Sequence, residues 1–522
     1  MHGMPHYPGN RNRLFSACNP EGLTYFKDCY TAGHLLINFD NANQQHLMNT
    51  TMHRLWVLVL GLSLLGALSG PGTATAQQAS SGWNALPGIL QKIVPPQFPD
   101  RDFSILDYGA KADGRSDCLG AVKKAIAACH TAGGGHVVIP AGTYFVKGPI
   151  HLLSNVNLVV EKGALLNFST DPDDYLPVVL TRFEGMELMN YSPLIYAYEQ
   201  QNVAVTGAGV LDGQASNSNW WNWTGSSRFG WKEGMGRQHD PANEPALVTM
   251  AANGVPVSQR IFGKGHYMRP SFLECYRCKN VLVQGITIRN TPFWILHPTL
   301  SSNVTIDGVT TTSLGPNNDG CDPESCDGVL IRNCSFRNGD DCIAIKSGRN
   351  EDGRRVNIPS RNIIVENCKM EDGHGGVVIG SETSGGIENV FVQDCRMDSK
   401  NLDRAIRIKS NGCRGGVLQH FYFRRIQVGR VREAVIRINM FYGGSKDGDC
   451  GFPPTLNGVY IDHVESQSSR YAIYIEGRSD KPVSNIHISD CTFRQVQQEN
   501  IIKDATDLHI AHTAINGKKM TL

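Results

Sequence analysis

The stretch Asn280-Val281-Leu282-Val283 returns 23 residues later as Asn303-Val304-Thr305-Ile306, and this repeat decides the fold of the chain. In each copy a turn residue precedes alternating β-branched or aliphatic residues. Neighbouring copies from residue 280 to residue 389 lie between 23 and 34 residues apart, which is typical of a solenoid. The other copies are Asn155-Val156-Asn157-Leu158, Asn202-Val203-Ala204-Val205, Gly328-Val329-Leu330-Ile331, Asn362-Ile363-Ile364-Val365, Asn389-Val390-Phe391-Val392 and Asn485-Ile486-His487-Ile488.

Short strands of this kind predict an all-β protein built as a parallel β-helix. Because their residues alternate, each strand can bury one face only by stacking on the next copy. A β-propeller or a β-sandwich is the alternative, but the strands of those folds pair through hairpins. Two-residue Asn-Gly or Asp-Gly turns, the usual hairpin signal, are not dominant in this sequence.

The N-terminal end of such a coil needs a cap, because an uncovered sheet edge invites aggregation. Residues 117–131 predict a capping helix that begins at Asp117 as N-cap and stops before Gly133-Gly134-Gly135. An apolar stripe would face the coil. It consists of Val122, Ala125, Ile126 and Cys129.

The composition is that of a globular protein with almost no net charge. Lys and Arg number 49 and Asp and Glu 48, so the formal net charge is +1. This balance argues against general attraction to nucleic acid or to an anionic membrane. With 41% hydrophobic and 19% charged residues, 522 residues can form several ordinary domains or one elongated repeat.

One apolar run, from Leu55 to Leu68, follows Met52-His53-Arg54 and precedes Ala74-Thr75-Ala76. This order is typical of a signal peptide, and the run is shorter than the roughly 20 residues of a membrane-spanning helix. We therefore expect a secreted or periplasmic protein without membrane contact after signal cleavage. The predicted segments are a wrongly assigned, disordered upstream extension (1–51), the signal peptide (52–76), a linker (77–100) and the β-helix domain (101–522) with an insertion at about 214–270.

The cysteines do not suggest a disulfide framework. Of 15 cysteines, 13 remain after Cys18 and Cys29 are set aside with the leader, and an odd number argues against complete pairing. Four occupy equivalent places in the repeat, where small buried side chains would stack. These are Cys334, Cys368, Cys395 and Cys491. Cys275 and Cys278 have the spacing of a redox or zinc pair, but no second pair accompanies them, so we expect no metal there.

The insertion between the copies at Asn202 and Asn280 is unusually long for a coil of short turns. Such loops are often functional. This one is rich in tryptophan, and either sugar stacking or packing of the loop onto the coil would explain that. The residues concerned are Trp220, Trp221, Trp223, Trp231, Arg237 and His239.

Three aspartates form the densest polar cluster, within Gly315-Pro316-Asn317-Asn318-Asp319-Gly320 and Asn338-Gly339-Asp340-Asp341-Cys342. The separation between Asp319 and Asp340 is close to one turn of the coil, so stacking at about 4.8 Å places the carboxyls together. For Asp340 and Asp341 to serve one site, the chain must bend, which Gly339 makes easier. Crowded carboxyls do not all stay ionised, so an acid and a base can coexist, as glycosidic hydrolysis requires.

Further along the chain, His374 lies among glycines, and Arg407 and Lys409 share one strand face. Each lies about one longer turn beyond the previous motif, so all could stack on the stripe of the aspartates. Acids flanked by cations suit a substrate that carries carboxylates, and Arg can bind a carboxylate in bidentate fashion.

The ordered set Asn317-x-Asp319, Gly339-Asp340-Asp341, Gly373-His374-Gly375 and Arg407-Ile408-Lys409 resembles the signature of the polygalacturonases, glycoside hydrolase family 28. The resemblance extends from Asp107-Tyr108-Gly109-Ala110 through the final repeats. It implies a single-stranded right-handed parallel β-helix of the pectin lyase-like kind. It also implies inverting hydrolysis of α-1,4-galacturonosyl bonds in pectin without a metal or other cofactor.

The resemblance also implies roles for single residues. Asp340 would be the general acid, and Asp319 and Asp341 would activate the attacking water. His374 would support the protonation and position of the acid. The substrate-binding residues would be Asn317, Arg407, Lys409 and, in Asn439-Met440-Phe441-Tyr442, Tyr442. The family usually has Thr where this chain has Asn318, whose side chain should point away from Asp319 by strand parity.

Several alternatives remain open on the sequence. Rhamnogalacturonan or xylogalacturonan could be the true polymer, a pectate lyase could use the aspartates as calcium ligands, and a non-catalytic β-helix could bind carbohydrate only. We expect exo-attack, because the insertion and the segment before the capping helix could close one end of the cleft. A monomer that acts on a pectic polysaccharide or oligogalacturonide is expected.

Overall fold

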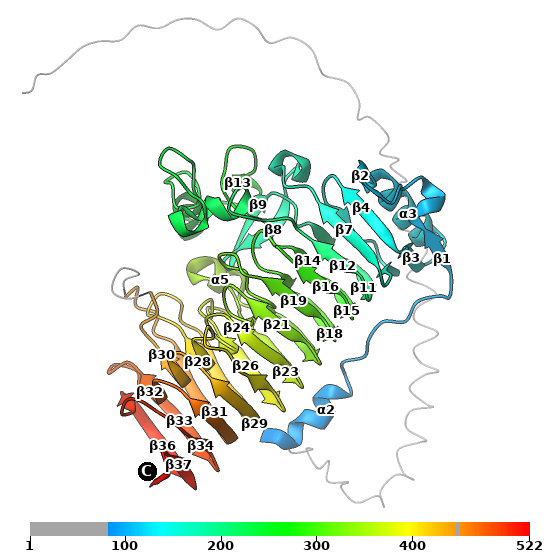
Figure 1. Ribbon diagram of the computed structural model, residues 1–522. Helices are drawn as coiled ribbons and strands as arrows, with labels where there is room; N and C mark the ends of the chain where they lie inside the picture. Colours follow the sequence, from blue (N-terminus) through cyan, green and yellow to red (C-terminus); the bar gives the residue numbers. More distant parts are fainter. Residues whose placement is uncertain (1–81, 444–448, 522) are drawn as a thin grey trace, which may run out of the picture. The chain divides into compact units, whose positions relative to one another are not determined.

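The computed structural model describes residues 82–443 and 449–521. The predicted upstream extension and signal peptide lie outside the described residues. The described part is a right-handed parallel β-helix, which confirms the expected fold class: strands stack rung upon rung from β1 at one end to β37 at the other (Figure 1). Among the described residues, no helix is long and apolar enough to span a membrane.

Each complete rung contributes a strand to the first of three parallel stacks. The first stack carries the repeat on which the fold prediction was based. Its strands are β1 (Asp102–Ser104), β3 (Gly135–Ile139), β6 (Val156–Val160), β11 (Gln201–Gly207), β15 (Lys279–Gln284), β18 (Ser302–Asp307), β20 (Asp327–Arg332), β23 (Ser360–Glu366), β26 (Ile387–Gln393), β29 (Val417–Arg430), β31 (Thr455–Ser468), β33 (Val483–Ser489) and β36 (Ala505–Ala511).

The second stack follows directly along each rung, and the long strands β29 and β31 run through both stacks. A final antiparallel strand, β38 (Lys518–Met520), pairs with β37. The other strands of the second stack are β2 (Asp113–Asp117), β4 (Gly142–Val146), β7 (Ala164–Phe168), β12 (Val210–Asp212), β16 (Thr287–Arg289), β19 (Thr310–Ser313), β21 (Ser335–Asn338), β24 (Lys369–Asp372), β27 (Arg396–Met397), β34 (Thr492–Phe493) and β37 (Thr513–Ile515).

The third stack carries the predicted site. Its two halves are joined by single bridges through Cys321 and Glu324, which stand between β17 and β22. Its strands are β5 (Ile150–His151), β10 (Ile195–Tyr198), β14 (Leu273–Tyr276), β17 (Leu296–Thr299), β22 (Ile343–Ile345), β25 (Val377–Ile379), β28 (Arg404–Lys409), β30 (Ala434–Asn439), β32 (Tyr471–Glu476) and β35 (Ile501–Lys503).

The repeated asparagine turns the chain into the first stack. Asn202, Asn280 and Asn303 have positive φ values of 54°, 58° and 53°, a conformation that Asn tolerates better than most residues. Their amides form a ladder: Asn280 donates to Asn202 at 2.8 Å and Asn303 to Asn280 at 2.7 Å. The residue after each turn then faces the core, as Val281 and Val304 do.

The capping helix is α3 (Leu119–Thr131), and its predicted stripe is buried, with Val122 and Cys129 at 1% and 0% exposure. It begins two residues later than Asp117. The Asp117 carboxylate nevertheless accepts hydrogen bonds from the backbone N–H of Leu119 at 2.9 Å and of Lys147 at 3.0 Å. It therefore satisfies a free donor of the first helical turn and ties the helix to the first rungs.

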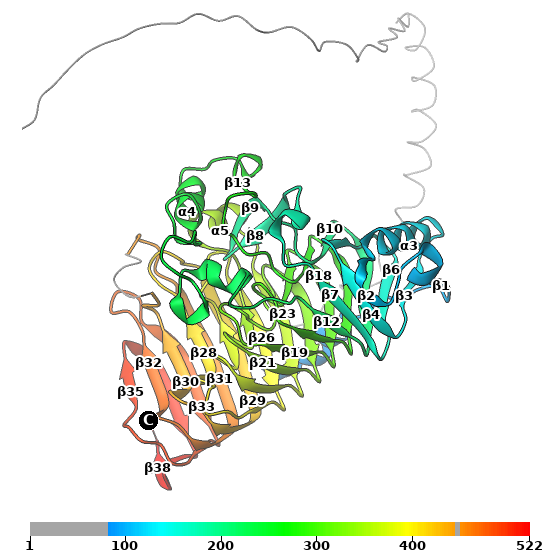
Figure 2. The same ribbon diagram turned by 45° about the horizontal axis from the view of Figure 1, so that its top comes forward.

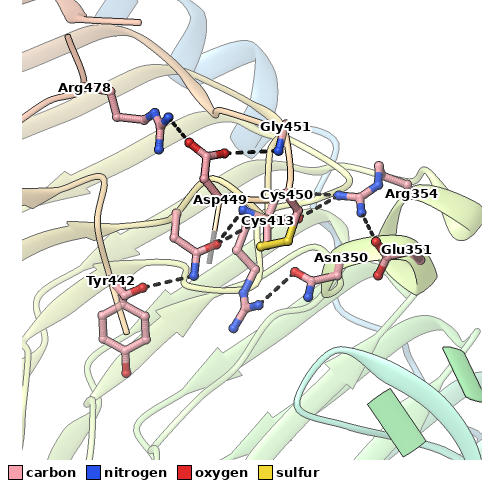
Figure 3. The surroundings of a disulfide bond; sticks show 11 residues. Asn350, Glu351, Arg354, Cys413, Tyr442, Asp449, Cys450, Gly451 and Arg478 are labelled. Atoms are coloured by element: carbon pink, nitrogen blue, oxygen red, sulfur yellow. Dashed lines mark hydrogen bonds and ion pairs between the residues drawn. A yellow bond between two sulfur atoms is a disulfide. The ribbon is translucent and has the colours of Figure 1, made fainter. Parts of the chain in front are cut away.

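The repeat cysteines are buried and free, as expected. Those at positions 334, 368, 395 and 491 are at most 2% exposed. A disulfide that the sequence did not suggest joins Cys413 to Cys450, across two loops that follow β28 and β30. Figure 3 shows this bond among polar side chains, which include those of Arg354, Asp449 and Arg478.

The segment expected to be a linker packs on the coil from residue 82 onward. A 3-10 turn, η1 (Gly82–Ala85), and a short helix, α2 (Leu86–Leu90), lie on the outer face of the first stack (Figure 1). Trp83 contacts Phe391 and Tyr422, and Leu86 is 5% exposed. Burial of this apolar surface orders the segment. It lies on the first stack, away from the cleft of the third, and so does not close it.

A cover over the third stack is formed instead by inserted elements. An antiparallel hairpin of β8 (Val179–Phe183) and β9 (Met186–Asn190), extended by β13 (Ile261–Phe262), lies with α4 (Glu244–Ala252) and α5 (Asn350–Val356) (Figure 2). Apolar side chains such as Leu188 and Leu247 hold it together. The sequence pointed to the insertion but not to the hairpin.

The insertion tryptophans mostly pack the loop onto the coil. Trp220 is 1% exposed and its ring contacts Tyr175 and Trp223. The indole N–H of Trp221 donates to the carbonyl of Thr291 at 2.9 Å. The structure therefore favours packing over sugar stacking for these side chains.

Candidate active site

Asp319, Asp340 and Asp341 meet on the third stack, as the sequence predicted. One carboxylate oxygen from each lies within 4.8 Å of the other two. Asp319 and Asp341 are 3% and 0% exposed, whereas the Asp340 side chain is 18% exposed and faces the opening. The arrangement follows from stacking, because Cys321 and Ile343, two residues beyond Asp319 and Asp341, pair across neighbouring rungs.

A tight turn presents two adjacent aspartates to one site. The N–H of Gly339 donates to the carbonyl of Ser313 at 2.8 Å, and a β-carbon at position 339 would lie 2.0 Å from the carbonyl oxygen of Gly315. Only glycine allows this approach. The N–H of Asp341 donates to the Asp340 carboxylate at 3.0 Å, which holds the turn in place.

His374 binds Asp340 directly. Its Nδ1 lies 2.9 Å from Asp340 Oδ1. Burial raises the pKa of Asp340, but the hydrogen bond and the charge of His374 outweigh burial and hold this pKa below its usual value. The same hydrogen bond raises the pKa of His374. In the free protein His374 therefore favours the ionised form of Asp340, which differs from the expectation that it supports the protonation of the acid.

Asp341 is held by the two predicted cations. Lys409 Nζ lies 2.7 Å from Asp341 Oδ2, and Arg407 lies 3.3 Å from Oδ1. Burial raises the pKa of Asp341, but these cations lower it further than burial raises it. The cations reach Asp341 from a different row than the spacing suggested. Arg407 pairs with Val378, and Val378 pairs with Ala344, which stands three residues after Asp341. A β-carbon at Gly375 would come within 3.0 Å of the Asp341 carboxylate.

Asp319 is the carboxyl of the three whose surroundings favour the protonated form. Burial, then the charges of Asp322 and Asp340, raise its pKa well above the usual range. Lys346 opposes this effect from 3.9 Å. The pKa of Asp319 is thus raised while those of Asp340 and Asp341 are lowered, so the protonated form is favoured most at Asp319.

Asn317 and Asn318 point in opposite directions, as strand parity predicts. Asn317 lines the pocket, and its Oδ1 accepts from Arg269 at 2.7 Å. Asn318 is fully buried inside the coil, where its Oδ1 accepts from Ser313 Oγ at 2.7 Å. Asn318 therefore supports the turn before Asp319 and does not face the reacting groups.

A pocket of about 450 Å³ opens beside the triad on the third stack. Tyr442 lines it, and Lys409 Nζ lies 4.8 Å from the centre of its ring. Several residues that line the pocket were not predicted from the sequence. They lie on rungs of the coil and on the inserted elements, and no sequence motif shows that these parts of the chain meet at the pocket. The residues concerned are Glu184, Trp294, Lys346, Arg349, Ser381, Glu382 and Arg414.

A second hollow of about 280 Å³ is lined by Gly339, which precedes Asp340, and by His374, which binds Asp340. Asp403 and two arginines, Arg228 and Arg432, also line it. Asp340 itself lines the first pocket, so it is adjacent to residues of both hollows.

Two groups in the described part of the chain gather ligand-type atoms that could hold a metal. One is the triad itself. The other consists of Asp462, His463 and Asp490 on a partly exposed surface. Lys409 and Arg407 already neutralise Asp341 in the triad, which leaves less negative charge for a cation than three free carboxylates would.

Comparison with known proteins identifies the family. The model for glycosyl hydrolases family 28 matches residues 259–514, and a model described as rhamnogalacturonase A/epimerase, pectate lyase-like, matches residues 103–165. The crystal structure of a hyperthermoactive exopolygalacturonase from Thermotoga maritima shares 44% sequence identity with a TM-score of 0.80, over 84% of this chain and 96% of that one.

Two curated relatives agree. A probable polygalacturonase of Vitis vinifera is 27% identical over 403 residues, which are 74% of this chain and 73% of the relative. An exo-poly-alpha-D-galacturonosidase of Dickeya chrysanthemi is 25% identical over 415 residues, which are 73% of this chain and 65% of the relative. Together with the triad on a parallel β-helix, these matches confirm the resemblance found in the sequence. The chain belongs to glycosyl hydrolases family 28 and is a glycoside hydrolase.

Proposed function

We propose that this glycosidase is an exo-acting polygalacturonase that hydrolyses α-1,4-galacturonosyl bonds with inversion. The observation that carries the proposal is the pocket in which acids and cations lie side by side. Asp340 and Asp319 line it together with Lys409. The carboxyls supply acid and base, and the cations match a substrate that carries a carboxylate on each sugar.

In this proposal Asp340 protonates the leaving oxygen, and Asp319 and Asp341 hold the water that attacks the anomeric carbon. The ionised Asp341 accepts the proton that this water loses. Asp340 is ionised in the free protein, so it must gain a proton when substrate binds. An anionic substrate beside Arg407 and Lys409 favours this step, because added negative charge raises the pKa of a neighbouring carboxyl. His374 then positions the acid and limits the rise of its pKa.

Exo-attack is supported by the cover at one side of the pocket. Glu184, from the turn between β8 and β9, and Arg349 line the pocket, and Arg349 binds Glu184 at 2.9 Å. Glu244 of α4, within the insertion, binds the same arginine at 3.0 Å. Three chain segments therefore meet at this wall, which limits the length of chain that the pocket accepts. The exo-acting relatives of this chain favour the same conclusion.

We also propose that the enzyme acts outside the cytoplasm, as a monomer on pectic material of the cell wall. The signal-peptide pattern before residue 77 favours export. The disulfide between Cys413 and Cys450 suits an oxidising compartment.

Digestion of polygalacturonate in the presence of a chelator tests the proposed function. We expect reducing ends without ultraviolet absorbance of unsaturated products, and short products of one length from the start. Absorbance that disappears with chelator would identify a lyase, and an early ladder of mixed oligomers would identify endo-attack. Cleavage of rhamnogalacturonan or xylogalacturonan in preference to polygalacturonate would change the substrate.

A further inference from the structure

A buried ion pair joins the cover to the third stack, close to the wall of the pocket. Arg182 lies in β8, and Glu184 of the wall follows directly after this strand. Glu324 follows Asp319 in the segment between β19 and β20. Nη1 of Arg182 lies 3.0 Å from Oε1 of Glu324, and both side chains are 0% exposed. The pair therefore connects the hairpin that forms the wall with the segment that carries a member of the triad.

His297 binds the same carboxylate from the coil. Its Nε2 lies 3.0 Å from Oε2 of Glu324, and its Nδ1 lies 3.6 Å from Glu274. Burial lowers the pKa of His297, but its bonds to Glu274 and Glu324 raise this pKa to about 9, so His297 is a cation at neutral pH. Thr181, next to Arg182 in β8, donates to Glu274 at 2.5 Å. Two cations and two carboxylates thus balance one another where the hairpin meets the coil.

The other carboxylates beside Arg182 have cations of their own. Asp352 binds Arg260 at 2.7 Å, and Glu187 binds Arg355 at 2.5 Å. The four residues of the balanced group, Arg182, Glu274, His297 and Glu324, are absent from the lining of both hollows. Any influence that they have on the reaction must therefore come from where they hold the wall.

A buried ion pair contributes little to stability, but it strongly favours one position of the hairpin. The cost of taking two charges out of water offsets most of their attraction, whereas a displaced hairpin would leave both charges buried and unpaired. The pairing survives only in the register in which Arg182 reaches Glu324. The apolar contact beside it, in which Phe183 stacks on Phe293 at 4.8 Å, specifies position less sharply.

We propose that Arg182 and Glu324 are positioning residues that determine the specificity of the enzyme, because their ion pair fixes the wall at the side of the pocket and so restricts attack to chain ends. This inference rests on the proposed exo-attack and names the residues that enforce it. Without the pair, apolar contacts still hold the cover on the coil, but the wall moves and the interior of a chain enters the pocket. The chemistry of the triad is unchanged.

The first products formed from polygalacturonate test the inference. Wild type should release short products of one length, whereas Arg182→Met should produce a ladder of mixed oligomers from the start. Its rate on trigalacturonate should stay within a few-fold of wild type, because the triad is intact. Arg182→Lys keeps the charge and should keep products of one length. The matched control is Arg361→Met, because Arg361 forms an exposed ion pair with Asp327 on the first stack, away from the cover.

Hydrogen exchange measures whether the wall itself moves. The amides of β8 and β9 in Arg182→Met should exchange about 100-fold faster or more, the factor that corresponds to loss of one partner of a buried ion pair. The amides of the first stack should keep their wild-type rates. The double variant Arg182→Met/Glu324→Gln removes both charges, so it should regain the melting temperature that the single variant loses and still give mixed oligomers. It carries the test even if the single variant does not fold.

Products of one length from the double variant, with faster exchange in β8 and β9, would overturn the inference and leave the proposed function standing. Unchanged exchange in this hairpin would overturn it as well, because the ion pair would then not position the wall. A ladder of oligomers from wild type would remove the exo-attack and this inference with it. The two failures are distinguishable, because the second appears in wild type and the first only in the variants.

Discussion

Lys409 lies 2.7 Å from a carboxylate oxygen of Asp341, a residue proposed to activate water, and its side chain is 6% exposed. The family resemblance implies that this lysine binds the substrate. In the free protein it also neutralises and orients a member of the triad. In the proposed function Lys409 therefore has two tasks. A substrate carboxylate bound to Lys409 would offset its positive charge and so raise the pKa values of the aspartates, which favours protonation of the acid.

The exchange of Asp340 for Asn should abolish hydrolysis without unfolding the protein. Asn keeps the shape of the side chain but cannot donate an acidic proton, and positioned general acids contribute about 10²- to 10⁴-fold to rates. Release of reducing ends from polygalacturonate measures the loss. Asp327→Asn is the matched control, because Asp327 forms an exposed ion pair with Arg361 on the first stack. Activity within a few-fold of wild type in Asp340→Asn would remove Asp340 from the mechanism.

The exchange of His374 for Asn should lower the maximal rate and move the alkaline limb of the pH profile upward. His374 lowers the pKa of Asp340, and without it burial dominates and the pKa rises. The acid then keeps its proton to higher pH, while its lost orientation reduces the rate about 10- to 100-fold. The profile of kcat/KM against pH measures both effects. The control is His420→Asn, because His420 is exposed and has a φ of 61°, a conformation that Asn tolerates. An alkaline limb that stays in place or moves to lower pH would contradict the role of His374.

The repeat, the cap and the triad could be predicted because each depends on local rules. Asn280 and Asn303 mark turns that only a few residues tolerate, and Asp319 and Asp340 stand one rung apart. The wall of the pocket could not be predicted in this way. Glu184 and Arg349 meet across 165 positions of sequence, and nothing near either residue marks the pairing. The same holds for Cys413 and Cys450, whose loops meet only once the rungs are stacked.

The exchange of Asp319 for Asn should stabilise the protein while it abolishes activity. The folded-state pKa of Asp319 is raised, so folding retains a proton that the unfolded chain releases above its own pKa of 3.8. Wild-type stability from this group is therefore full below that pH and declines as pH rises towards the folded pKa. Asn removes the dependence, so its gain in melting temperature, about 2 °C or more, should be larger at pH 8 than at pH 5. Thermal melts at both pH values measure it, and an equal or smaller gain at pH 8 would contradict the proton on Asp319.

Loss of the disulfide should lower stability and substrate affinity together. The bond closes a loop of 37 residues, and such bonds contribute about 2–4 kcal/mol. It also fixes the turn that carries Arg414, so the double variant Cys413→Ser/Cys450→Ser should show a higher KM with a smaller change in kcat. A reducing agent should lower the melting temperature of wild type and leave the variant unchanged. If the reducing agent lowers the melting temperature of wild type and of the double variant equally, the stabilising effect does not come from this disulfide.

The stereochemistry of the product tests which group attacks the sugar. The spacing of the carboxylates does not favour inversion, because oxygens of the triad lie within 4.8 Å, whereas inverting pairs usually stand about 6.5–9.5 Å apart. The groups that surround these carboxylates nevertheless favour inversion. A carboxylate nucleophile must be ionised and free to approach carbon, but both oxygens of Asp341 bind cations, and burial raises the pKa of Asp319 and favours its protonated form. Water held between them is the remaining nucleophile, and the ionised Asp341 accepts the proton that this water loses. Proton NMR during the first minutes of digestion should therefore show the β-anomer at the new reducing end. If the α-anomer forms first, one of these aspartates attacks the sugar directly, and the charge assignments of the triad must change.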